Sequence, residues 1–275
     1  MIIQWFPGHM AKAKRELETR LSEVDCVLEI IDARAPLASR NPDLVKLLSG
    51  KLHLVILNKA DLASPDVTAR WLQVLRTDGV DAASFSALKD NPRKLFQSIN
   101  AIGFCQPHRG DLRLLVAGIP NVGKSAVINK LAGRRRAAIG AKPGLTRSQQ
   151  WIRVAKRLIV LDTPGMLWPK FADSDVGYKL AAINAIRAEV LPLEEVALWL
   201  AQRLNELAPS TLETSYDLES YNSTTVLTGI ANRRGLYLRG GRLDTERAAA
   251  LLLREFQQGR LGPISLELPE KGEQV

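Results

Sequence analysis

The sequence predicts an α/β fold in which a parallel sheet covered by helices is followed by a smaller all-helical domain. Three observations indicate this arrangement. Short, continuous apolar runs each end in a polar signature that favours a loop, and amphipathic stretches lie between these runs. Continuous apolar runs are typical of strands covered on both faces, as in a parallel sheet. After Gly165 the strand pattern fades and helical patterns dominate.

The apolar runs place the expected strands. In chain order they lie within DCVLEIIDAR (25–34), LHLVILNKAD (52–61), AASFSAL (82–88), LRLLVAG (112–118) and RLIVLDTPG (157–165). The helices expected between them include PDVTARWLQVLRT (65–77) and SAVINKLAG (125–133). This alternation predicts strand–helix–strand units. Ligands of such sheets bind at the carboxyl ends of the strands, which is where the polar signatures lie.

The last part of the chain predicts a separate helical domain. We expect one domain over residues 1–174 and a second over 175–275. The helical patterns of the second domain are DVGYKLAAINAI (175–186), PLEEVALWLAQRLNEL (192–207) and DTERAAALLLREFQQG (244–259). In the last of these, Asp244 is expected to be the N-cap and Gly259 the C-terminal stop.

Composition narrows the classes of protein. The chain is 46% hydrophobic and 24% charged, which supports a packed core. No apolar run approaches the ~18 residues of a membrane span, and the N-terminus lacks the apolar centre of a signal peptide. We therefore expect a cytoplasmic protein with no membrane partner. Cys26 and Cys105 form no CxxC pair, and the three histidines have no metal-ligand spacing.

The charge distribution favours a polyanionic partner. The net charge is +9, and residues 112–161 contain no Asp or Glu. This region holds a group of basic residues, Arg134, Arg135, Arg136, Lys142, Arg147, Arg153, Lys156 and Arg157, and a second group comprises Arg233, Arg234, Arg239 and Arg242. The alternative is a solvated basic face, but two groups with so little acid between their members favour nucleic acid.

A phosphate-binding loop is expected at the end of the fourth strand. Residues 118–125, GIPNVGKS, fit the pattern GxxxxGKS, whose glycines let backbone N–H groups converge on phosphates at a helix N-terminus. Lys124 would reach the β- and γ-phosphates, and the Ser125 hydroxyl would bind Mg²⁺. The nucleotide contacts expected here are Asn121, Val122, Gly123, Lys124, Ser125 and Ala126.

A second loop predicts which base is bound. Residues 58–61, NKAD, follow the second strand and fit NKxD. Guanine presents two donors on one edge, and the Asp61 carboxylate would accept both, whereas adenine would place a lone pair there. Asn58 would hold the loop and the base, and the Lys59 stem would cover the ring. After the third strand, Ser86 and Ala87 would add a backbone N–H to the guanine oxygen.

Residues later in the chain are expected to bind the γ-phosphate and the metal ion. Residues 162–165, DTPG, fit DxxG, in which Asp162 would hold Mg²⁺ and the Gly165 N–H would contact the γ-phosphate. A GTPase also needs a threonine between the phosphate loop and DxxG, and KPGLTR offers Thr146. The expected metal ligands are thus Ser125, Thr146 and Asp162.

The order of these motifs resembles the circularly permuted GTPases, because NKxD precedes the phosphate loop and DxxG comes last. The segments WFPGHMAKA (5–13), DARAPLASRNP (32–42) and 244–267 resemble the members of that family that act in ribosome biogenesis. The resemblance implies a P-loop GTPase sheet with permuted motif order, hydrolysis of GTP to GDP, and late assembly of the large ribosomal subunit with contacts to ribosomal RNA. We also expect a monomer that has no DNA partner. In this order DxxG leads directly into the helical domain.

The catalytic residues are less regular. The position after DxxG, which is often glutamine, is Met166, which cannot orient water. The resemblance implies that His9 supplies this function, and the alternative is that His9 only packs its loop. It also implies that Asn121 helps to bind K⁺, although an ordinary loop asparagine is the alternative. The expected catalytic set is His9, Lys124, Thr146 and Gly165.

Three other functions compete with an RNA-associated GTPase. An ATPase or nucleoside kinase would use the same phosphate loop, but Asp61 argues against adenine. A signalling switch is disfavoured because no lipidation motif is visible and the chain is basic. A non-enzymatic RNA-binding protein is disfavoured by the intact Lys124, Ser125 and Asp162.

Overall fold

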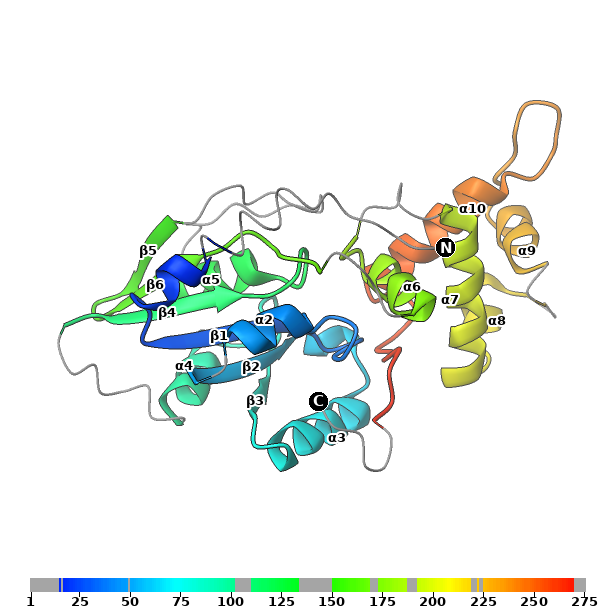
Figure 1. Ribbon diagram of the computed structural model, residues 1–275. Helices are drawn as coiled ribbons and strands as arrows, with labels where there is room; N and C mark the ends of the chain where they lie inside the picture. The colour runs from blue at the N-terminus through cyan, green and yellow to red at the C-terminus, as the bar shows by residue number, and fades with distance from the viewer. Residues whose placement is uncertain are drawn as a thin grey trace.

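The computed structural model describes residues 15, 17–48, 50–101, 110–133, 150–168, 173–186, 192–218, 222 and 225–269. A sheet with its flanking helices forms one side of the molecule and a group of helices forms the other (Figure 1). Among the described residues, no helix is both long enough and apolar enough to cross a membrane.

The sheet has six strands in the order β3-β2-β1-β4-β6-β5. The strands are β1 (Cys26–Asp32), β2 (Leu52–Asn58), β3 (Asp81–Ser84), β4 (Leu112–Ala117), β5 (Gln150–Ala155) and β6 (Leu158–Asp162). All neighbours pair in parallel except β5, which pairs antiparallel to β6 at the edge. The parallel sheet predicted from the apolar runs is confirmed, whereas β5 was not expected.

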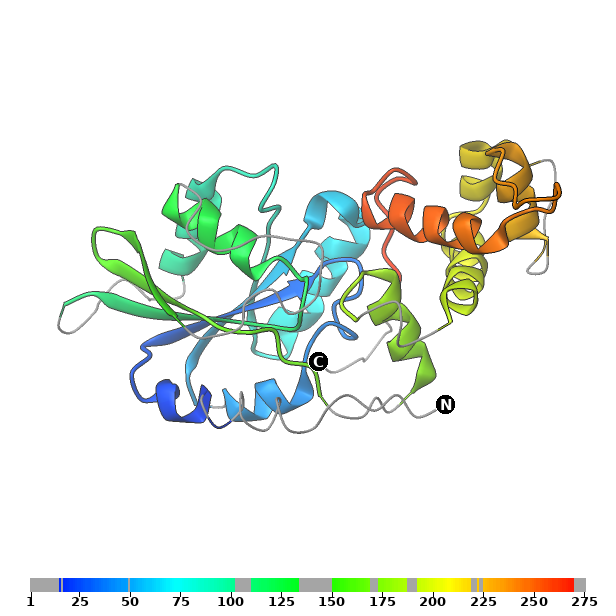
Figure 2. The ribbon, with the colours of Figure 1, turned by 90° about the horizontal axis from the view of Figure 1, so that it is seen from above.

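Helices cover both faces of the sheet (Figure 2). They are α2 (Pro42–Leu47), α3 (Pro65–Thr77), α4 (Pro92–Ala101) and α5 (Lys124–Ala132), together with a helical segment over 17–21 and a short 3-10 helix, η1 (Ala60–Leu62). Alternate residues of β1 face opposite sides, because Ile30 shares a cluster with α4 and α5 whereas Ile31 packs against α3. The helix predicted over 65–77 is confirmed to the residue.

The helical group follows the last strand. It contains α6 (Ser174–Ala182), α7 (Leu193–Leu207), α8 (Thr211–Tyr216), α9 (Val226–Arg233) and α10 (Thr245–Gln257). Asp244 caps α10, because its side chain accepts from the Arg247 N–H, and Gly259 has φ +72° just past the helix end. Both predicted ends of this helix are confirmed. The expected division between residues 174 and 175 stays a prediction, and in the structure it falls inside the first turn of α6.

The chain returns to the sheet after α10. The Ile264 N–H donates to the Leu62 carbonyl (3.1 Å), and the Leu266 N–H donates to the Arg34 carbonyl (2.7 Å). The Glu267 carboxylate accepts from the N–H groups of Leu37 and Ala38. We call residues 264–267 the return segment. It joins the helical group to loops at the carboxyl ends of β1 and β2.

Candidate nucleotide-binding site

The candidate site lies where the carboxyl ends of the parallel strands meet. The central strands β1 and β4 are neighbours, and the chain proceeds from them toward opposite edges of the sheet. Such a reversal of strand order opens a crevice that commonly binds ligands. The loops that follow β2, β4 and β6 carry NKxD, the phosphate loop and DxxG, so the topology brings the three motifs to one edge.

Close packing at two glycines fixes the phosphate loop. A Cβ on Gly118 (φ +142°) would lie 2.3 Å from the Ile30 carbonyl oxygen, and one on Gly123 (φ +100°) would lie 2.2 Å from Nδ2 of Asn58. Both conformations are ones that side chains resist. Glycine therefore permits the loop to lie directly against β1 and NKxD.

Lys124 begins α5 with its ammonium group buried under the loop. Its Nζ donates to the carbonyls of Gly118 (3.1 Å) and Ile119 (2.8 Å). Burial lowers the pKa of Lys124 to about 8, and the nearby Asp162 charge only partly opposes this effect. A cation held by neutral carbonyls and removed from water is well suited to an anionic ligand.

Asp162, at the end of β6, is fully buried, and neither carboxylate oxygen has a hydrogen-bond partner among the described residues. Burial raises the pKa of this carboxyl, against the opposing charge of Lys124. Buried carboxylates are normally paired or bound to metal. Oxygen ligands of this kind fit Mg²⁺, and Ser125 in the first turn of α5 offers a hydroxyl. The donor set therefore fits a magnesium ion.

Asn58 connects the phosphate loop to the loop that follows β3. Its Nδ2 donates to the Val122 carbonyl (2.7 Å), and its Oδ1 accepts from the Ala87 N–H (3.1 Å). The Ser86 N–H donates to Asp90 (2.9 Å). A guanine oxygen would therefore have to share the Ala87 donor with Asn58.

The remaining NKxD side chains are those of Lys59 and Asp61. Lys59 has φ +58° and precedes η1, which contains Asp61. The Asp61 carboxylate is mostly buried and lies 3.5 Å from Nζ of the exposed Lys89. The Lys59 Nζ lies 2.8 Å from Oδ2 of Asp32, at the end of β1.

Asp32 and Arg34 were not among the site residues expected from the sequence. Arg34 forms a two-point ion pair with Asp32, through Nε (2.9 Å) and Nη2 (2.8 Å). Asp and Arg at the end of a buried strand, two positions apart, were a signal that could have identified them.

The DxxG turn lies against the phosphate loop. A Cβ on Gly165 would lie 2.6 Å from the Pro120 nitrogen, and the Met166 N–H donates to the Gly118 carbonyl (3.3 Å). The Met166 side chain is buried in the cluster beneath α2. Met166 therefore packs the core and does not face water.

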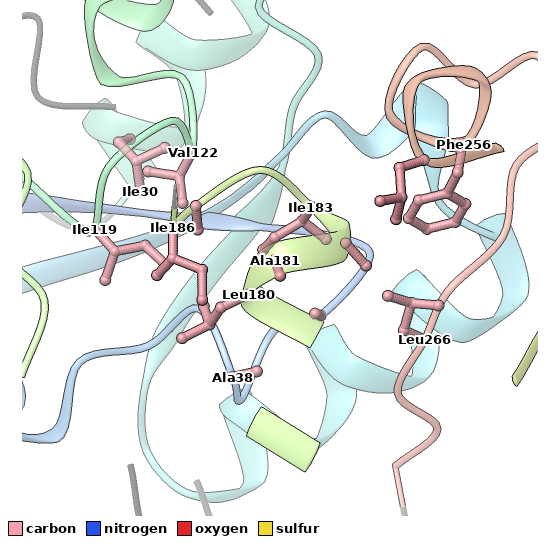
Figure 3. Packing of buried hydrophobic residues seen from close by; sticks show 14 of the residues in the cluster. Ile30, Ala38, Ile119, Val122, Leu180, Ala181, Ile183, Ile186, Phe256 and Leu266 are labelled. Atoms are coloured by element: carbon pink, nitrogen blue, oxygen red, sulfur yellow. The ribbon is translucent and has the colours of Figure 1, made fainter. Parts of the chain in front are cut away.

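Asn121 connects the phosphate loop to the helical group. It has φ +59°, and its Nδ2 donates to the Asn184 carbonyl (2.7 Å), just past the end of α6. Figure 3 shows Leu180 and Ile186 of this region beside Ile119 of the loop. The phosphate loop thus contacts the helical group through polar and apolar groups.

Some expected residues lie outside the described residues. His9 and Thr146 are among them, as are the basic residues from Arg134 to Arg147. Their expected roles therefore stay predictions.

Comparisons with known proteins identify the family of the chain. Residues 113–227 match the family described as 50S ribosome-binding GTPase. Ribosome biogenesis GTPase A of Priestia megaterium is 39% identical over 100% of this chain and 99% of its own length. That of Thermotoga maritima is 35% identical over 98% of this chain and 95% of its own.

A solved structure extends the agreement to the fold. The structure titled GNP-bound YlqF from T. maritima superposes with a TM-score of 0.70 at 30% identity, covering 94% of this chain and 99% of that one. The GDP-bound YlqF structure gives a TM-score of 0.71 at 28% identity. Sequence and fold therefore agree over nearly the whole length, and the chain belongs to the ribosome biogenesis GTPase A family and hydrolyses GTP.

Proposed function

We propose that this GTPase acts late in the maturation of the large ribosomal subunit, binds ribosomal RNA, and works as a monomer in the cytoplasm. The names of its relatives support a ribosomal role. The observation that carries the RNA contact is a hairpin between α9 and α10.

The hairpin, residues 236–243, projects from the helical group (Figure 1). Tyr237 pairs antiparallel with Leu243, and the Leu238 N–H donates to the Arg242 carbonyl (2.8 Å). Tyr237 and Leu238 are 47% and 45% exposed, and Arg239 and Arg242 are exposed beside them. Aromatic rings stack on unpaired bases and arginines bind phosphates, so this surface suits RNA.

The other arginines of this group are engaged by protein. Arg233 pairs with Asp217 (3.0 Å). Arg234 lies 3.8 Å from the Glu255 carboxylate and over the Tyr216 ring. The hairpin is therefore the part of this arginine group that is best placed to bind a polyanion.

The catalytic assignments form part of the same proposal. Ser125, Asp162 and Thr146 would hold Mg²⁺, which when bound neutralises charge on the β- and γ-phosphates. Lys124 and the Gly165 N–H would bind the γ-phosphate. His9 would orient or deprotonate the attacking water, a role that the buried Met166 does not fill. Asn121 would help to hold K⁺ near the phosphates.

Co-sedimentation with purified ribosomal subunits tests the main proposal. We expect binding to the large subunit, tighter with a non-hydrolysable GTP analogue than with GDP by roughly 5–150-fold. The double variant Arg239→Ala/Arg242→Ala should weaken binding and reduce its salt dependence. Arg70→Ala/Arg93→Ala removes the same charge from exposed positions on α3 and α4 and is the matched control. An equal loss of subunit affinity in both double variants would show that the hairpin arginines contribute only through the net charge of the protein.

Hydrolysis assays test the catalytic assignments. His9→Ala should lower the hydrolysis rate with the subunit present while GTP affinity stays nearly unchanged, because the side chain acts on water. Replacing K⁺ by Na⁺ should also slow hydrolysis. A His9→Ala rate within about twofold of wild type would remove His9 from the mechanism.

A further inference from the structure

A buried charge cluster lies beside the base-reading loop. Asp32 is fully buried, and its carboxylate accepts two hydrogen bonds from the Arg34 guanidinium. The Lys59 Nζ lies 2.8 Å from Oδ2 of the same carboxylate. Burial alone would raise the pKa of Asp32, but the charges of Arg34 and Lys59 outweigh it and bring the pKa well below its ordinary value. The carboxylate therefore stays ionised between two cations.

Asp32 fixes the course of the Lys59 side chain. A lysine stem is flexible, and an ammonium in water would leave it free to take many rotamers. Here the backbone is left-handed at Lys59, and the ammonium is pinned at the end of β1. The stem is thus held in one place before any base arrives, which removes an ordering cost from binding.

Arg34 connects this cluster to α10. Its Nη1 donates to the Phe256 carbonyl at 3.5 Å, and its guanidinium lies over the Phe256 ring, 5.2 Å from the centroid. Its own carbonyl accepts from the Leu266 N–H (2.7 Å). Figure 3 shows Phe256 and Leu266 on the same side of the α6 region. Arg34 therefore contacts the buried charge cluster, α10 and the return segment.

The return segment also holds the far end of the base-reading loop. The Ile264 N–H donates to the Leu62 carbonyl, and the Ser64 N–H donates to Oγ of Ser265 (3.2 Å). A Cβ on Gly259 would lie 2.6 Å from the Leu62 side chain. The loop from Lys59 to Ser64 is thus held by Asp32 at its start and by the C-terminal part of the chain at its end.

We propose that Asp32 is a positioning residue for guanine recognition, and that α10 and the return segment brace it through Arg34. The helical group then sets guanine nucleotide affinity through contacts remote from the phosphates. Binding of a partner to that group and binding of the nucleotide are reciprocally linked. The inference rests on the assignment of residues 58–61 as the base reader.

The first test is Asp32→Asn, measured by titration of a fluorescent GDP derivative and by GTP hydrolysis. We expect the Kd for GDP and the KM for GTP to rise together, roughly 10–100-fold. The kcat should stay unchanged, because the lost interaction stabilises the bound substrate and the transition state equally. Glu29→Gln is the matched control: Glu29 is another buried acid of β1, and it pairs with Arg40 (3.3 Å) away from the base loop. Unchanged KM in Asp32→Asn, or an equal rise in Glu29→Gln, would overturn the proposal.

A double-mutant cycle separates positioning from general stability. Lys59→Met keeps an apolar stem but removes the ammonium that Asp32 holds. The effect of Asp32→Asn on GDP affinity should largely disappear in this background, since the two changes break one interaction. Additive effects would show that Asp32 acts through the fold alone.

Phe256→Leu tests the brace without changing any buried charge. We expect GDP affinity to fall roughly two- to fivefold, from the lost contact with the Arg34 guanidinium. Phe96→Leu removes a ring of the same size from α4, where it packs against the core, and should leave affinity unchanged. Unaltered affinity in Phe256→Leu would limit the network to Asp32 and Lys59.

Asp61→Asn distinguishes a failure of this inference from a failure of the assignment on which it rests. If Asp61→Asn leaves base preference unchanged, the base-reader assignment fails as well. If only Asp32→Asn lacks its expected effect, the positioning role of Asp32 fails and the assignment stands.

Discussion

The two edges of the nucleotide site differ in how their charged groups are satisfied. On the edge proposed to read the base, Asp32 and Lys59 pair with each other, and Arg34 completes the cluster. On the proposed phosphate edge, both Asp162 oxygens are buried with no partner among the described residues, and Lys124 donates to two carbonyls of its own loop. Charges left in this condition are costly unless a ligand joins them.

The difference indicates two strategies within one site. On the proposed base-reading edge, protein contacts already orient the groups that would meet guanine. The phosphate edge keeps its cation and carboxylate in a dry setting that phosphate and metal would complete. Changes on the first edge should therefore alter affinity for the base, whereas changes on the second should alter catalysis and the response to pH.

The largest effect is expected from Asp61→Asn. The amide no longer accepts both guanine donors, so GTP affinity should fall by roughly 10³–10⁴-fold, with a gain in affinity for xanthosine triphosphate. Competition titrations with the two nucleotides measure both values. Unchanged guanine preference in a folded variant would remove Asp61 from the base-reading edge.

Asp162→Asn should act on the other edge. Hydrolysis at saturating GTP and Mg²⁺ should fall by roughly 10²–10³-fold, because a metal ligand is lost while the phosphate loop stays in place. GDP affinity without Mg²⁺ should change far less, which equilibrium binding can establish. A large loss of metal-free GDP affinity would mean that Asp162 organises the loop rather than the metal.

The pH dependence of GDP binding tests the buried cation. The Lys124 pKa of about 8 lies below its ordinary value, and bound phosphates would raise it again. The complex then holds the proton more tightly than the free protein, so affinity is full below pH 8 and falls as pH rises above it. Calorimetry should show a loss of up to roughly tenfold between pH 7.5 and 9. Lys124→Arg, which stays charged, should show a flatter profile over this range.

Gly165→Ala should have the smallest effect. The added Cβ would lie 2.6 Å from the Pro120 nitrogen, which forces the DxxG turn away from the loop. Affinity for a GTP analogue should fall roughly fivefold, and affinity for GDP less, because only the γ-phosphate needs this turn. Gly229→Ala in α9, where the nearest atom is the end of the Leu218 side chain, is the control. Equal losses for both nucleotides would show that the two loops act as one unit.

The sequence predicted the parallel core well because its strands are continuous apolar runs between recognisable loops. It did not reveal β5, since Gln150 and Arg153 leave QWIRVA without a continuous apolar run, and the strand lies at the edge, antiparallel to β6. An edge strand needs no continuous apolar run, so its pattern resembles that of many surface segments.

The candidate site was predictable where spacing alone defines the chemistry, as in GxxxxGKS, NKxD and DxxG. The contacts of Arg34 with Phe256 and of Asn121 with Asn184 were not predictable. They join residues 222 and 63 positions apart through single bonds to backbone carbonyls. Such hydrogen bonds leave no repeating pattern in the sequence, and the backbone carbonyl of any residue type can accept them.

The return segment has a consequence for synthesis of the protein on the ribosome. The Ser64 N–H meets its acceptor, Ser265, 201 residues later in the chain. At typical elongation rates that interval is roughly 10–40 s. Once residue 125 has been added, and until residue 265 is added, the nascent chain carries NKxD and the phosphate loop but not the contacts that hold the far end of the base-reading loop. Full guanine affinity should therefore be acquired only after the return segment has been made, and a shorter nascent chain should bind guanine nucleotide more weakly.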